Sequence, residues 1–176
     1  MPTAPAALTI VAHDPATNAW PREALATLLI DCVQAGASIG FLAPLSRDEA
    51  NAFWDGVHAD IGPDHPIWFG WLGDQLAGTV QLDRARRANG RHRAEVCKLM
   101  VSPVARRQGL ARALMTAAED QARRLGLQLL HLDTMAGSEA EPLYRGLGWR
   151  FSGQIPLFAG WPDGALGATA IYWKVL

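Results

Sequence analysis

The sequence predicts one mixed α/β domain, in which a mixed sheet carries helices on both faces. Three observations lead to this fold class. Short apolar runs typical of strands alternate with segments whose apolar residues recur at helical spacing. Hydrophobic residues make up 49% and charged residues 19% of the 176 residues, which is enough apolar surface to build a core. No repeat, low-complexity tract or linker divides the chain, so residues 1–176 are expected to form a single domain, with residues 1–7 flexible.

The first half of the chain predicts a strand, two helices and two further strands. The first helix begins at Pro21 and ends at Gly36, with apolar residues at i, i+3, i+4, i+7 and i+8. Ser46 and Glu49 spell a capping box that opens the second helix. Gly73-Asp74 is a hairpin signal between the last two strands. The three predicted strands are Leu8–Ala12, Ile67–Leu72 and Leu76–Leu82.

The second half predicts a strand, a helix, a strand, a short helix and two final strands. Asn89-Gly90 reads as a second hairpin signal, and Pro103 stops the strand that follows it. Gly126 ends the long helix. The predicted elements are a strand over 91–101, a helix over 110–125, a strand over 127–132, a helix over 142–147, and strands over 149–154 and 169–175. A segment rich in Pro and Gly, around 161–164, separates the last two strands.

Charge and composition exclude several classes of partner. The formal net charge of -1 gives no global attraction to nucleic acid or to an anionic membrane. The basic run at 84–93 contains no aromatic residue to stack on bases, so it is expected to be a solvated hairpin tip that can attract an anionic ligand. The histidines are scattered and the cysteines have no ligand spacing, so no metal is expected. The chain shows neither a signal peptide nor a transmembrane run, which predicts a soluble cytoplasmic protein.

The most informative segment is 96–115, where an apolar strand enters a basic turn that leads directly into an amphipathic helix. A helix N-terminus presents unpaired N–H groups and the positive end of a dipole, which together favour an anion. Gly109 removes the Cβ that would hinder close approach of a phosphate, and Ala111 keeps the next turn small. Arg106 and Arg107 add charge-assisted donors. The segment therefore predicts a phosphate-binding turn.

The motif Arg106-x-x-Gly109-x-Ala111 resembles the R/Q-x-x-G-x-G/A signature of the GNAT superfamily of acetyltransferases. The run from Leu143 to Trp149 resembles the L-Y-x-x-L-G-F segment found at the matching distance in these enzymes. Segments between His92 and Trp149, and again near the C-terminus, resemble the tabtoxin-resistance type. The resemblance implies a GNAT-like, mostly antiparallel central sheet and acetyl-coenzyme A (acetyl-CoA) as cosubstrate. It assigns the pantetheine arm to Leu99, Met100, Val101 and Ser138, and the phosphates to Arg106, Arg107, Gln108, Gly109, Leu110 and Ala111.

Three residues are candidates for the chemistry of acetyl transfer. Tyr144 occupies the position of the family's general acid, and a phenol of pKa about 10 can protonate a thiolate whose thiol has a pKa of about 8.5. The alternative for Tyr144 is a core aromatic. Glu95 and Asp133, on neighbouring predicted strands, are candidate bases. Glu95 could equally be a solvent-facing strand residue, and Asp133 a turn or capping residue. Ser138 could equally cap a helix with Glu141, although Pro142 would then make the helix begin later or kink.

The leading hypothesis is therefore an N-acetyltransferase that acts on the amine of a small molecule, such as an amino-acid-like toxin or antibiotic. The amine would attack acetyl-CoA directly in a ternary complex. Two alternatives stay open: an acetyltransferase for protein or peptide amines, and a non-catalytic module that binds acyl-CoA. A homodimer through exposed sheet edges is also expected.

Overall fold

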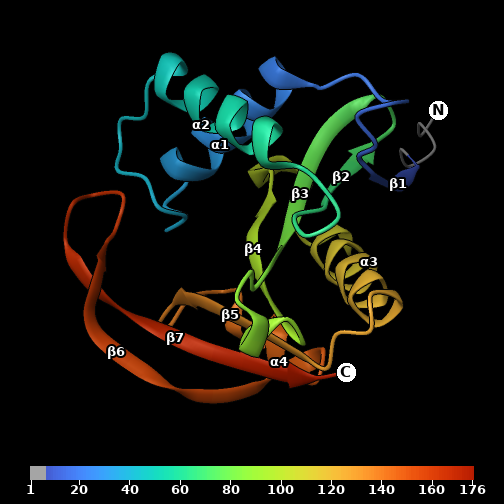
Figure 1. Cartoon of the computed structure of the whole chain (residues 1–176). Helices are drawn as coiled ribbons and strands as arrows, with labels where there is room; N and C mark the ends of the chain where they lie inside the picture. Colours follow the sequence, from blue (N-terminus) through green and yellow to red (C-terminus); the bar gives the residue numbers. More distant parts are fainter. Residues whose placement is uncertain (1–6) are drawn as a thin grey trace.

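The computed structural model describes residues 7–176, in which seven strands form one mixed sheet in the order β1-β2-β3-β4-β5-β7-β6 (Figure 1). Among these residues, β4 and β5 are the one parallel pair and the other neighbours are antiparallel. This confirms the predicted fold class. The flexibility expected for residues 1–6 lies outside the described residues. The strands are β1 (Leu8–Ala12), β2 (Ile67–Leu72), β3 (Gln75–Arg84), β4 (Arg93–Val101), β5 (Leu129–Met135), β6 (Arg150–Gly160) and β7 (Leu166–Val175). The helices are α1 (Arg22–Gln34), α2 (Arg47–Asp60), α3 (Leu110–Arg124) and α4 (Glu141–Gly146), with 3₁₀ turns at Ala88–Gly90 and Pro103–Ala105.

Helices cover both faces of the sheet and form two cores. One core joins α3 and α4 to the middle strands, and the other joins α1 and α2 to β2, β3 and β4. Two strand glycines let α3 lie close to the sheet. A Cβ on Gly70 would lie 2.5 Å from Leu110 Cδ1, and a Cβ on Gly78 would lie 3.0 Å from Leu114 Cδ1. This close packing fixes the N-terminal end of α3 beside β4.

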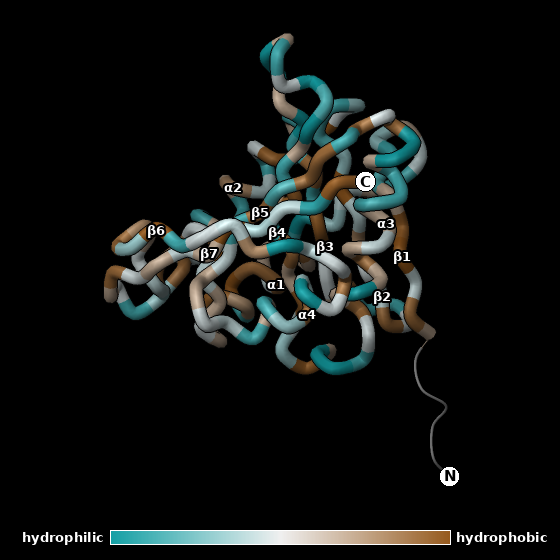
Figure 2. The backbone as a smooth tube through the Cα atoms, turned by 90° about the horizontal axis from the view of Figure 1, so that it is seen from below, coloured by the Kyte–Doolittle hydropathy of each residue, from teal (hydrophilic) through white to brown (hydrophobic). Residues whose placement is uncertain are grey.

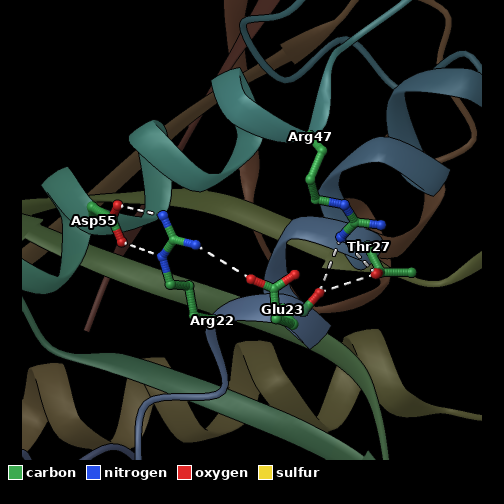
Figure 3. A network of polar contacts seen from close by, with 5 residues as sticks. All are labelled: Arg22, Glu23, Thr27, Arg47 and Asp55. Atoms are coloured by element: carbon green, nitrogen blue, oxygen red, sulfur yellow. Dashed lines mark hydrogen bonds and ion pairs between the residues drawn. The ribbon is translucent and has the colours of Figure 1, made fainter.

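The α1–α2 pair is held by polar contacts on its exposed side (Figure 3). The Arg22 guanidinium donates to both carboxylate oxygens of Asp55, each at 2.7 Å, and to Glu23 at 3.2 Å. Arg47 Nη1 donates to Thr27 Oγ1 at 2.9 Å and to the Glu23 carbonyl oxygen. Exposed pairs of this kind contribute modestly, so the buried apolar faces of the two helices supply most of the stability.

Ser46 begins α2 with the predicted capping box: its side chain accepts from the Glu49 N–H, while the Glu49 carboxylate accepts from the Ser46 N–H. Replacing Ser46 with Ala is expected to lower the free energy of unfolding by about 1 kcal/mol. Urea unfolding followed by circular dichroism measures this loss. Ser152→Ala, at an exposed position of β6, is the control and should leave stability unchanged. Equal stability of both variants would contradict a stabilising role for the cap.

Two expectations were wrong, one about the end of a strand and one about a hairpin turn. The strand predicted to end at Gln154 continues to Gly160. Pro156 is tolerated there because β6 is the edge strand, where the missing N–H has no partner to lose, and Leu157 adopts φ +54° at a register shift. Asn89-Gly90 does not form a two-residue hairpin turn. Instead it ends a 3₁₀ turn within the longer connection between β3 and β4.

The hairpin of β6 and β7 extends from the body of the protein as an arm (Figure 2). Its tip returns to the connection between α1 and α2, where the Ala43 N–H donates to the Pro162 carbonyl oxygen at 2.8 Å. Leu42 also packs near Gly160, since a Cβ on that glycine would lie 3.2 Å from Leu42 Cδ2. The arm and the α1–α2 connection therefore meet.

Candidate active site

The parallel strands β4 and β5 pair over three residues and then separate. Their last register pair is Glu95 with His131. Beyond it, β4 continues to Val101 with β3 as its partner, and β5 continues to Met135 with β7 as its partner. Within the described residues, the facing backbone edges of the two strands beyond this point have no strand partner. This opening offers unpaired backbone groups to an extended ligand.

The predicted pantetheine residues Leu99, Met100 and Val101 lie on this free edge of β4. Their side chains are occupied by packing: Met100 lies in the α1–α2 core, while Leu99 and Val101 pack against the other core. Their backbone groups on the free edge remain available to a ligand.

A β-bulge at Lys98 shifts the register of β4, a feature that the sequence did not predict. Lys98 adopts φ +51°, and the pairing passes from Cys97 opposite Gln81 to Met100 opposite Thr79. The Lys98 ammonium donates to the Ile39 carbonyl oxygen at 3.0 Å, which ties the α1–α2 connection to the strand. Bulges frequently redirect strands beside active sites. Nothing in the composition indicates this one, because lysine has no preference for a positive φ.

The basic turn between β4 and α3 has the shape of an anion cradle. Arg107 at φ +61° and Gly109 at φ +84° are left-handed, and α3 begins at Leu110 with no acidic residue in its first turn and no side-chain cap. A Cβ on Gly109 would meet no atom within 4 Å, so the turn faces open space. The first N–H groups of α3 and the exposed side chains of Arg106, Arg107 and Gln108 remain available there. Leu110 is buried, so it can contribute backbone only, and Ala111 is half-buried.

Tyr144 lies on α4 and points into the core, with 6% of its surface exposed. Its ring packs against Trp149 and Tyr172, at centroid distances of 6.3 and 5.8 Å. Burial first, and then the Asp133 carboxylate, raise the pKa of Tyr144 to about 12, while a hydrogen bond with Thr134 acts in the opposite direction. The phenol is thus protonated at neutral pH and lies near the residues that end β5.

Glu95 and Asp133 lie on the two separating strands. Glu95 is half-buried, and its pKa is raised by burial first and then by the negative charges of Asp133 and Asp83. Asp133 is exposed and accepts a hydrogen bond from Thr169 Oγ1 at 2.8 Å. Asp133 lies inside β5, so its alternative as a turn or capping residue was wrong. The charge of Asp133 acts on both Glu95 and Tyr144, which places the three candidates around one end of the opening.

The segment leading into α4 corrects the alternative offered for Ser138. The N-cap of α4 is Ala140, without a side-chain bond, and Pro142 lies in the first turn, where a missing N–H costs nothing. Ser138 Oγ instead lies 3.3 Å from Thr134 Oγ1. The alternative of a capping box between Ser138 and Glu141 was therefore wrong. The helix instead begins later, at Glu141, which is one of the two effects expected from Pro142.

Glu141, named in the sequence analysis only as a capping partner of Ser138, is a buried carboxylate. It accepts from the Gly137 N–H at 2.7 Å, from Arg145 at 2.7 Å and from the Tyr172 hydroxyl. These bonds, the Tyr172 one first, lower the pKa of Glu141, so it is ionised at neutral pH. The network fixes α4 against β7 and thereby the position of Tyr144.

The profile of the acetyltransferase (GNAT) family matches residues 22–149. The chain belongs to this family. An N-acetyltransferase of Azospirillum brasilense, named for the hisH-hisA intergenic region, is 33% identical over 142 residues, which cover 76% of this chain and 83% of that protein. This GNAT chain is therefore an acetyl-CoA-dependent N-acetyltransferase.

Solved GNAT structures share the fold. The structure of yncA from Salmonella typhimurium, assigned as an acetyltransferase and solved with its cofactor acetyl-CoA, has a TM-score of 0.76 at 20% identity, covering 96% of this chain and 94% of that one. A structure assigned as a phosphinothricin N-acetyltransferase has a TM-score of 0.78 at 17% identity, covering 97% of this chain and 99% of that one. At these identities the likeness concerns the fold alone.

Over residues 7–176, no three His, Cys, Asp or Glu side chains gather as a ligand set for a metal ion. No helix in that range has the length and apolar character needed to cross a membrane.

Proposed function

We propose that this N-acetyltransferase moves the acetyl group of acetyl-CoA to the amine of a small molecule, by direct attack in a ternary complex. The observation that carries the proposal is the opening between β4 and β5, which lies between the basic turn of α3 and the group of Glu95, Asp133 and Tyr144. Acetyl-CoA supplies an acetyl thioester. The chain supplies the binding surface, the base and the acid.

The proposed binding residues divide by the kind of group they offer. The backbone edge at Leu99, Met100 and Val101 would bind the pantetheine arm, with Ser138 beside it from the β5 side. The turn would bind the phosphates through N–H groups and exposed cationic or amide side chains. Its proposed contributors are Arg106, Arg107, Gln108, Gly109, Leu110 and Ala111.

The proposed chemical roles follow from the ionisation of each group. Tyr144, kept protonated by burial, would protonate the departing thiolate. Glu95 or Asp133 would accept the proton of the attacking amine. The raised pKa of Glu95 suits it to this role, because a carboxylate of higher pKa holds a proton more readily.

If Glu95 is the base, kcat/KM should fall as the pH drops through its raised pKa, which lies above the ordinary range of glutamate. Below that pKa the carboxyl is protonated and cannot accept another proton. Above it, kcat/KM levels off with rising pH, which gives the profile an acidic limb. The pH profile of kcat/KM measures this, and Glu95→Gln should remove the acidic limb together with about 100-fold or more of the rate. Asp133→Asn is the comparison: loss of the limb in that variant alone would assign the base to Asp133.

One feature supports a small acceptor over a protein or peptide. The arm of β6 and β7 meets the α1–α2 connection through the Ala43–Pro162 hydrogen bond, which restricts the space for a long chain. We also propose that, within the family, the chain is of the tabtoxin-resistance type.

A thiol-release assay with acetyl-CoA tests the proposal across matched sets of small amines and peptides. Turnover with small amines supports it. Turnover with peptides alone would assign the alternative, a peptide acetyltransferase. Acetyl-CoA binding without turnover on any amine would assign the non-catalytic module.

Two further expectations stay predictions. A homodimer would form at the exposed edge strand β6, whose apolar side chains include Ile155, Leu157 and Phe158. Light scattering on the purified chain measures the mass. A cytoplasmic location is testable by fractionation of the source cells.

A further inference from the structure

A hollow of about 190 Å³ lies beside the opening, on the face of the sheet that carries Glu95. Its lining comes from β3, β4 and β5 and from the residues that follow β3. Glu95 belongs both to this hollow and to the group of catalytic candidates. Part of the basic run at 84–93, which was expected to be a solvated hairpin tip, also lines the hollow. Nothing in the proposed function so far uses these arginines.

Three arginines line the hollow, and among the described residues Arg93 is the one of them without a salt-bridge partner. Within the described residues, no carboxylate oxygen lies within 4.0 Å of its guanidinium, whereas Arg84 pairs with Asp64 and Arg86 with Asp60. Arg93 Nη1 lies 3.2 Å from His131 Nε2. Burial, and secondly the charge of Arg93, lower the pKa of His131, so the ring is neutral and accepts this hydrogen bond. The neutral ring orients the guanidinium without cancelling its charge.

Carboxylates occupy the neighbouring part of the same hollow. Asp83 lies directly opposite Glu95 in the β3–β4 register, and like charges in this arrangement repel each other. Among the described residues, no lysine or arginine nitrogen lies within 4.0 Å of either carboxylate. A cation from outside the chain would relieve the repulsion.

The spacing of these charges suits one small molecule that carries both signs. Arg93 and Glu95 are two residues apart on one strand, so they share a face and lie about 7 Å apart along it. The ammonium group of such a molecule would bind at Asp83 and Glu95, and its oxyanion would bind at Arg93. The ammonium end would then lie at the point where β4 and β5 separate.

We propose that this hollow is the acceptor subsite and that the acceptor is an amine bearing a carboxylate, with Arg93 binding the carboxylate and Asp83 holding the amine beside Glu95. The inference rests on the proposed function and names the class of its acceptor. Arg93 and Asp83 are accordingly specificity-determining residues. Neither belongs to the acetyl-CoA site.

The kinetic test compares each of the twenty common L-amino acids with its α-carboxamide in the thiol-release assay. Each amide keeps the amine and loses the carboxylate. The expected result is acetylation of at least one amino acid, with kcat/KM about tenfold or more above that of its amide. Arg93→Gln should abolish the preference, Arg93→Lys should keep part of it, and Arg87→Gln, at an exposed arginine outside the hollow, should keep all of it. Equal rates for acids and amides, or an unchanged preference in Arg93→Gln, would overturn the proposal.

A binding test is independent of turnover. Protein labelled with ¹³C-histidine is titrated with sodium acetate and, at equal ionic strength, with sodium chloride, while the His131 ring signal is followed. The proposal expects a saturable shift with acetate that Arg93→Gln loses and Arg87→Gln retains. No shift beyond that of chloride, or an unchanged shift in Arg93→Gln, refutes the subsite. If no amine is turned over while the acetate shift is present, the proposed function fails and the anion subsite stands.

Discussion

Replacing Tyr144 with Phe is expected to reduce kcat by about 100-fold or more while leaving the dissociation constant of acetyl-CoA within about twofold. The ring packs against Trp149 and Tyr172, and Phe preserves that packing. Only the hydroxyl is removed, and this hydroxyl is the group proposed to protonate the thiolate. Steady-state thiol release gives kcat, and calorimetry gives the dissociation constant.

Tyr172→Phe is the matched control. Its hydroxyl donates to the buried Glu141, so its loss should lower stability, because Glu141 then lacks one of its donors. Its kcat should nevertheless stay within a few-fold of the wild-type value. A Tyr144→Phe variant as active as the wild type would show that Tyr144 is a core aromatic without a chemical role.

Replacing Gly109 with Trp should weaken acetyl-CoA binding by about 100-fold or more. The indole would fill the open space in front of the turn and displace at least two hydrogen bonds to the phosphates, each contributing about 1.5–3 kcal/mol. The left-handed backbone at this position would add about 1–2 kcal/mol of strain to the folded chain. Calorimetry measures the binding, and urea unfolding measures the strain.

Gly126→Trp separates these two effects. Gly126 follows the other end of α3, is also left-handed at φ +69°, and would place its Cβ in equally open space. Its strain should be similar, but acetyl-CoA binding should be unchanged, since no phosphate is expected there. Similar weakening by both variants would mean that Gly109 acts through stability and not through the ligand.

Local signals with a direct physical cause were predictable from the sequence. The capping box at Ser46 formed because a side-chain oxygen and a carboxylate satisfy each other's backbone donors within four residues. The turn at Gly109 was predictable because a basic, glycine-containing segment leads directly into an amphipathic helix, whose first N–H groups are free. The left-handed backbone of Gly109 was not part of that prediction. The positions of Glu95 and Asp133 on neighbouring strands followed from the order of strands in the resembling family.

Features that depend on tertiary pairing were not predictable. The bulge at Lys98 arises from the mismatch between β3 and β4, and no residue preference announces it. The length of β6 was missed because both of its faces are largely exposed, so the strand lacks the alternating pattern that marks a buried face. The partners of Glu141 come from α4 and β7 and meet only in the folded chain. The unpaired charge of Arg93 likewise appears only when the partners of its neighbours are known.

Residue-resolved hydrogen exchange with and without saturating acetyl-CoA tests the location of the cosubstrate most directly. Binding is expected to protect the backbone amides on the free edge of β4 at 99–101 and those of the turn and first helical residues at 108–112. Little change is expected in β1 and at the far end of α3. Saturable binding that protects other segments, and leaves these two unchanged, would contradict the placement of acetyl-CoA between β4, β5 and α3.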